Sequence, residues 1–132
     1  MATAAAYAAT PLLDITQLTA TANTNRDGTT GVYTAVATGT AAGKYIRRVV
    51  LCAAATTTAG VVRFFVSPDS GTTKRLVKEY LIPAITPSTT LEVYRAEIGE
   101  LAGLVLPSTT HILYCNTNNA ETFNVSVESG GF

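Results

Sequence analysis

The sequence predicts an all-β fold: a two-sheet antiparallel sandwich of about eight strands, jelly-roll-like, with an extended N-terminal arm. Three observations predict it. Thr, a β-branched residue that suits a pleated sheet, is unusually frequent. Short β-rich runs alternate with turn residues at the spacing of a sandwich. No long segment keeps a 3.6-residue apolar stripe. The 132 residues suffice for one domain with its own core.

The N-terminal region is expected to differ from the rest of the chain. Residues 1–31 form the expected arm and turn-rich lead-in, and residues 32–132 form the expected sandwich domain. The arm has four apolar residues that need a partner surface, either on this chain or on a neighbouring subunit: Leu12, Leu13, Ile15 and Leu18. Residues 12–18 have room for one short helical turn.

Turn residues mark the expected strands from residue 32 onward. Ser67-Pro68-Asp69-Ser70-Gly71 is a tight-turn sequence, and two runs, 62–66 and 123–127, alternate apolar and polar residues. Alternation indicates one core face and one wetter face. An immunoglobulin-like sandwich is the alternative, disfavoured by the absence of Trp and by the cysteine spacing. The expected strands cover 32–38, 45–53, 60–66, 75–82, 90–98, 101–106, 111–116 and 122–127.

Charge and composition narrow the function. Nine Lys plus Arg balance nine Asp plus Glu, so nucleic acid and anionic membrane are not expected partners. No signal peptide and no membrane-spanning run is expected. Low charge and 47% apolar residues suit a packed assembly. Cys52 and Cys115 are expected to be reduced, with a disulfide as the open alternative.

No motif indicates catalysis, so the sequence predicts a protein that is not an enzyme and has no cofactor. The lone histidine, His111, is expected to be structural. The closest approach to a metal motif is a calcium-like turn with oxygen-bearing side chains at Asn23, Asn25 and Asp27. Thr34 stands where that loop needs a bidentate glutamate. An Asx-type turn is therefore favoured over a metal site.

Three further residues are candidates for an interface between subunits. Arg47 and Arg48 are neighbours in a β-rich run, so at least one of them needs an ion pair, a sheet edge or an interface. Phe65 lies on the wetter face of its expected strand and is a candidate for a contact buried between subunits. The alternative is a second core face covered by the N-terminal arm.

Several segments, taken in order, resemble small structural proteins of tailed phages and prophages. They are TATANTNRDG (19–28), TTTAGVVRFF (56–65), AITPS (84–88), GLVLP (103–107), NAETFNV (119–125) and the closing GGF. The resemblance implies a virion component made in the host cytoplasm, foremost a capsid cement or decoration protein of the phage head. It implies a homotrimer that contacts copies of itself and the major capsid protein. The alternative is a tail or fibre module that binds host glycans or other tail proteins, with Tyr33, Tyr45, Tyr80, Tyr94 and Tyr114 as contacts.

Overall fold

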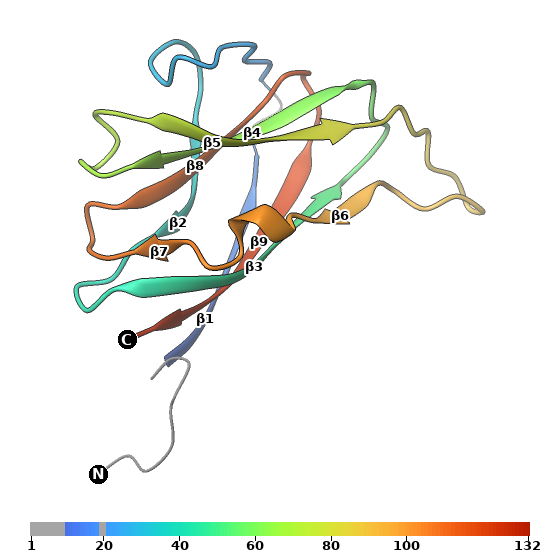
Figure 1. Cartoon of the computed structure of the whole chain (residues 1–132). Coiled ribbons are helices and arrows are strands. Elements are labelled where there is room, and N and C mark those ends of the chain that lie inside the picture. The colour runs from blue at the N-terminus through green and yellow to red at the C-terminus, as the bar shows by residue number, and fades with distance from the viewer. Residues whose placement is uncertain (1–9, 19–20) are drawn as a thin grey trace.

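The computed structural model describes residues 10–18 and 21–132, which form two antiparallel sheets packed face to face (Figure 1). Sheet A has the order β1-β9-β3-β6, and β7 also pairs with β3. Its strands are β1 (Thr10–Gln17), β9 (Phe123–Gly131), β3 (Lys44–Ala53), β6 (Arg95–Glu97) and β7 (Val105–Leu106). Sheet B has the order β2-β8-β4-β5. Its strands are β2 (Thr34–Thr38), β8 (Ile112–Thr117), β4 (Gly60–Ser67) and β5 (Arg75–Ile82).

This strand order is that of a jelly roll. If β6 and β7 are counted as one interrupted strand, the chain passes repeatedly between the sheets, and only β4 and β5 follow each other within one sheet. The first strand, β1, lies beside the last, β9, with Thr10 opposite Gly131 and Gln17 opposite Asn124. The predicted fold class, an antiparallel jelly-roll-like sandwich, is confirmed.

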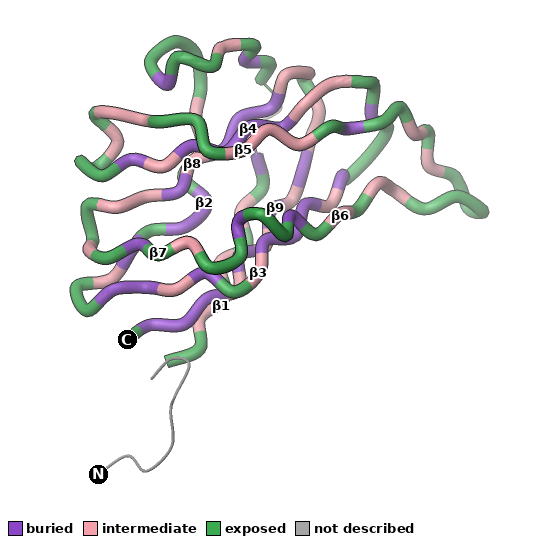
Figure 2. Tube along the Cα trace, in the orientation of Figure 1, coloured by how far each residue is buried: buried purple, intermediate pink, exposed green. Residues whose placement is uncertain are grey.

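The core lies between the sheets, where buried residues line both inner faces (Figure 2). The predicted alternation of core and wetter faces is confirmed in β9, where Val125 and Val127 point into the core. In β4 only the predicted core residues Val62 and Phe64 are confirmed, because the opposite face is buried as well. All four side chains are fully buried. This packing fixes which residues of each strand face outward.

Residues 10–17 of the expected arm form a strand of the sandwich, which corrects the prediction that this segment lies outside it. Thr10–Gln17 pairs with β9 along its whole length, so no helical turn forms there. The strand is followed by Leu18, whose amide donates to the Phe123 carbonyl oxygen at 2.8 Å and whose side chain is in the core. Burial of one face of this segment against sheet B outweighs any local helix preference. Residues 1–9 and 19–20 of the expected arm lie outside the described residues.

Two expected strands are much shorter than predicted. The run 90–98 contributes only β6, and 101–106 contributes only β7, after a 3-10 turn, η1 (Gly99–Leu101). Gly103 adopts φ +93°, which turns the chain between η1 and β7. Before β6, residues 83–94 form a loop that projects away from the sandwich (Figure 1).

Candidate functional site

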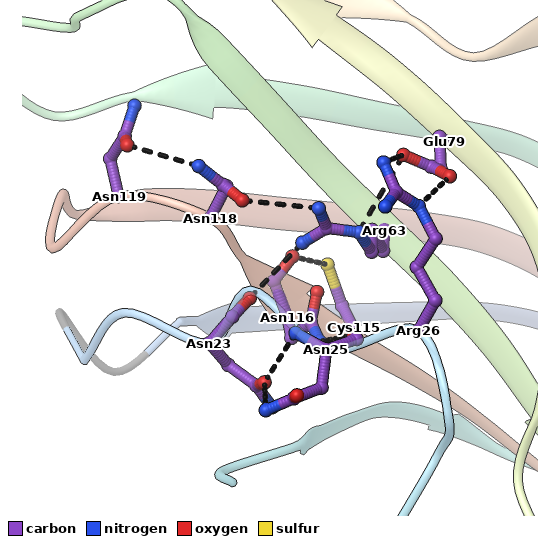
Figure 3. Close-up of polar contacts among 9 residues, drawn as sticks. All are labelled: Asn23, Asn25, Arg26, Arg63, Glu79, Cys115, Asn116, Asn118 and Asn119. Carbon is purple, nitrogen blue, oxygen red and sulfur yellow. Dashed lines mark hydrogen bonds and ion pairs between the residues drawn. The ribbon is translucent and has the colours of Figure 1, made fainter. Parts of the chain in front are cut away.

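The central part of the outer face of sheet B is covered by the chain itself, whereas Leu81 on the edge strand β5 stays 78% exposed. Arg63 and Phe65 alternate with the core residues of β4 and therefore point outward, yet they are only 2% and 0% exposed. Residues 21–33, called the lead-in below, cross this face and cover both side chains. Figure 3 shows the polar contacts that hold the lead-in around Arg63.

Arg63 is the centre of this network. Its guanidinium donates to the carbonyl oxygen of Asn23 and to Oδ1 of Asn118, each at 3.1 Å. Its Nε lies 3.6 Å from Oε2 of Glu79. Burial lowers the pKa of Arg63, so the charge is held at a cost that these contacts offset. The same Glu79 accepts two hydrogen bonds from Arg26, which lower the pKa of Glu79. The lead-in is thereby tied to two strands of sheet B.

The calcium-like sequence forms an Asx-type turn within the lead-in. Oδ1 of Asn23 accepts hydrogen bonds from the amide and the side chain of Asn25, both at 3.0 Å. Oδ1 of Asp27 accepts the amides of Thr29 and Thr30 at 3.0 Å, and these bonds hold the pKa of Asp27 well below its usual range. Two of the oxygens proposed as ligands, Oδ1 of Asn23 and Oδ1 of Asp27, are therefore acceptors within the Asx-type turn that the sequence favoured. Among residues 10–18 and 21–132, no group of three or more His, Cys, Asp or Glu could hold a metal ion.

Phe65 lies under the lead-in rather than at a subunit contact, which corrects its prediction as an interface residue. The ring of Tyr33 packs edge-on against it, with the ring centroids 5.0 Å apart. The ammonium of Lys74 lies 5.2 Å from the Tyr33 ring centroid and 5.0 Å from that of Tyr114. The alternative stated from the sequence, a second core face covered by the N-terminal region, is the one found.

The outer face of sheet A, in contrast, is open. A hollow of ≈ 300 Å³ crosses four of its strands. Leu13 and Ile15 on β1 are 60% and 66% exposed, while Val50 on β3 is only 7% exposed and forms part of the floor. The hollow is lined by Leu13, Ile15, Arg48, Val50, Cys52, Arg95, Ser126 and Glu128.

The strand registers explain why these residues meet. Glu128 lies opposite Leu13 on one side and Arg48 on the other, and Arg48 and Glu128 form an ion pair. One row further, Ser126 lies between Ile15 and Val50. Arg48 and Glu128 pair with each other on this face. The face therefore presents an apolar stripe, formed by Leu13, Ile15 and Val50, beside a compensated pair of charges.

The structure thus brings three predicted interface residues together and separates the others. Leu13, Ile15 and Arg48 line the hollow, and Arg47 is the exposed extra residue of a bulge beside it. Leu12 faces inward and is half-buried, and Leu18 is in the core, so neither is available to a partner as predicted. The sequence missed Val50, Cys52, Arg95, Ser126 and Glu128, because only the pairing of β1 with β9 and of β9 with β3 places them here.

The remaining candidates are dispersed. Nδ1 of His111 lies 2.8 Å from the hydroxyl of Ser108 within the turn that follows Pro107. Cys52 and Cys115 are free thiols, on the outer face of sheet A and in the core, respectively. The tyrosines named for a glycan site are all half-buried: Tyr33, Tyr45, Tyr80, Tyr94 and Tyr114.

In the described part of the chain, no helix is long and apolar enough to span a membrane. Comparison with protein-family models, with curated proteins and with solved structures gave no match.

Proposed function

We propose that this chain is a non-enzymatic structural protein of a phage virion, and specifically a cement or decoration protein of the head shell. The observation that carries the contact role is the contrast between the two outer faces. The lead-in covers Arg63 and Phe65 at the centre of the sheet B face, whereas the face of sheet A exposes Leu13 and Ile15 beside a hollow. The virion setting rests on the resemblance of six sequence segments to phage and prophage structural proteins.

An exposed apolar stripe on a rigid sandwich favours binding to another protein surface. Leu13 and Ile15 are more than half exposed, and each releases about 1–2 kcal/mol when it is fully removed from water. The formal net charge of zero leaves no long-range repulsion between neighbouring copies. Both properties suit a protein that works in a dense, ordered shell.

The projecting loop 83–94 is the second contact that we assign to shell binding, in place of the expected arm. Its base is anchored to Thr57, whose Oγ1 donates to the Pro83 carbonyl oxygen at 2.7 Å and whose amide donates to that of Ile85 at 2.9 Å. Its outer part closes a turn in which the Ser88 amide donates to the Leu91 carbonyl oxygen at 2.9 Å. Leu91 is 50% exposed. A loop with a fixed base and an apolar outer part can grip a neighbouring subunit.

The test is binding to assembled heads. The purified chain is mixed with heads from a phage deleted for its gene, sedimented, and assayed for binding and for heat-induced release of DNA. We expect saturable binding and a higher release temperature. Leu91→Asp should weaken binding at least tenfold and abolish the rise in release temperature. The matched control is Leu81→Asp, an exposed leucine on β5, which should bind like the unchanged chain. Absence of the chain from intact heads, or saturable binding on a glycan array instead, would overturn the proposal.

A further inference from the structure

We propose that the free edge of β1 pairs, antiparallel, with β1 of a second copy, joining two copies of sheet A into one continuous sheet across a two-fold axis. This self-association is separate from the proposed binding to the head shell, and it can be measured on the purified chain alone. It follows from the direction of the backbone groups of β1, from the way the other sheet edges are protected, and from a register in which β1 fits itself.

The backbone groups at the free edge can be assigned from the pairing with β9. The amide of Leu18 donates to Phe123, so Leu18 is in a hydrogen-bonded pair with β9. Such pairs alternate along an antiparallel ladder, and in this register Leu12, Asp14 and Thr16 therefore also bond to β9. Leu13, Ile15 and Gln17 then point their N–H and C=O groups away from β9, where no described strand pairs with them.

The other three sheet edges carry features that discourage pairing, whereas β1 carries almost none. Strand β2 has five residues and a bulge, and β6 has three residues. Strand β5 carries Lys78 and Glu79 in its middle. Strand β1 has eight residues in continuous register with β9, and only Pro11, near its start, lacks an N–H for pairing. A long, flat edge with exposed apolar residues is a template for another strand.

Charge does not oppose the approach of a second copy. The only charged residue of β1, Asp14, points inward, and its Oδ2 accepts a bond from Nζ of the buried Lys44 at 3.0 Å. On the outer face, Arg48 is compensated by Glu128. The two surfaces that meet therefore present Leu13, Ile15 and uncharged polar groups to each other.

One register satisfies these constraints together. With Ile15 on the two-fold axis, Leu13 lies opposite Gln17 of the second copy, and each of these pairs exchanges two backbone hydrogen bonds. Asp14 then lies opposite Thr16 rather than opposite another Asp14, which avoids like charges in a cross-strand pair. Pro11 falls at the margin of the paired segment. The stripe formed by Val50 and Ile15 continues across the axis into the second copy.

The first test is the association state of the full chain in solution. Sedimentation velocity over a wide range of concentrations should show a monomer and a dimer in equilibrium. Ile15→Lys should weaken dimerisation at least tenfold, because it places two charges against each other on the axis. The control Leu81→Lys changes the most exposed leucine of an edge strand in sheet B, at 78% exposure, and should dimerise normally. A monomer at all concentrations, or the trimer that the resemblance implies, would overturn the proposal.

A second test fixes the register without relying on a disruptive charge. In a Cys52→Ser background, Ile15→Cys should form a disulfide-linked dimer on mild oxidation, because paired Cα atoms about 5.5 Å apart are within disulfide range. The matched control Gln17→Cys should form no disulfide-linked dimer when alone and should crosslink only when mixed with Leu13→Cys. Equal crosslinking of Ile15→Cys and Gln17→Cys alone would refute this register, and failure of both, together with the Leu13→Cys mixture, would refute the β1 interface.

Discussion

Replacement of Arg63 by methionine tests whether the polar network holds the lead-in on sheet B. Methionine replaces the apolar stem of the side chain and removes the guanidinium with its charge and its donors. The carbonyl oxygen of Asn23 and Oδ1 of Asn118 would each lose a partner at 3.1 Å. Glu79 would keep its two bonds from Arg26, so no carboxylate is left uncompensated.

The expected loss of stability is set by two opposing effects. Each buried acceptor left without a donor costs about 1–3 kcal/mol. The removed guanidinium no longer has to be desolvated, and burial already lowers the pKa of Arg63, which reduces the net loss. We expect the free energy of unfolding to fall by about 2–4 kcal/mol, which lowers Tm by about 8–16 °C for a domain of this size.

The assay combines urea unfolding with limited trypsin digestion. Unfolding gives the free energy, and cleavage after Arg26 reports local release of the lead-in before the sandwich unfolds. The control Arg47→Met makes the same change at an exposed arginine without an ion pair among the described residues, and should alter stability by less than about 0.5 kcal/mol. An Arg63→Met protein as stable as the unchanged chain, with equal trypsin resistance, would refute the reasoning.

Three further outcomes are expected. A thiol reagent should titrate one cysteine, Cys52, in the native protein and both in denaturant, because Cys115 is fully buried and burial raises its pKa; two fast thiols in the native state would contradict this placement. Asp27 and Glu79 have pKa values lowered by hydrogen bonds, so they stabilise the fold above their unfolded pKa of about 4 and lose this contribution as the pH falls. The urea midpoint should therefore begin to drop below about pH 5 and continue to drop below about pH 3, towards the lowered pKa of Asp27 in the folded state. Asp27→Asn should make that drop smaller; the same drop in this variant would argue against a contribution from Asp27. Gly28→Ala should cost about 1–3 kcal/mol in thermal melts, since Gly28 has φ +76° and a Cβ would lie 2.2 Å from the Lys74 carbonyl oxygen; an unchanged Tm would contradict the close packing.

Local signals were enough to predict the strands whose ends are marked by turn residues. The expected strand 75–82 coincides with β5, and 60–66 falls one residue short of β4. In both cases Pro, Gly or Ser marks the boundary, and the side chains between them suit a sheet. The fold class depends on many such segments and is therefore well determined by the sequence.

Strand β1 could not be recognised from its own residues. Leu12 and Leu13 are adjacent, so the apolar residues do not alternate strictly. No Pro or Gly directly follows Gln17 to mark the end of the strand. What makes the segment a strand is its backbone pairing with β9, more than a hundred positions later in the chain; at one end of that pairing, Gln17 lies opposite Asn124. Pairing at that distance leaves no local trace.

The long-range pairing with β9 also limited how much of the candidate site could be predicted from the sequence. Leu13 and Ile15 were predicted among four apolar residues that need a partner surface, and Arg48 as one of two arginines of which at least one needs a partner. Their neighbours Glu128 and Ser126 become part of the surface only through the register of β9. Sequence reasoning therefore identified residues of the surface without identifying the surface.

The position of β9 has a consequence for how the domain folds. This strand is the last of the sandwich, yet it lies inside sheet A, between β1 and β3. During synthesis, β1 and β3 have no partner between them until β9 has been made. Sheet A must then be completed by the insertion of one late strand into a gap rather than by addition at an edge. We therefore expect slow folding, in the range typical of β-sandwiches, with a nascent chain that exposes two unpaired strand edges until its last strand arrives.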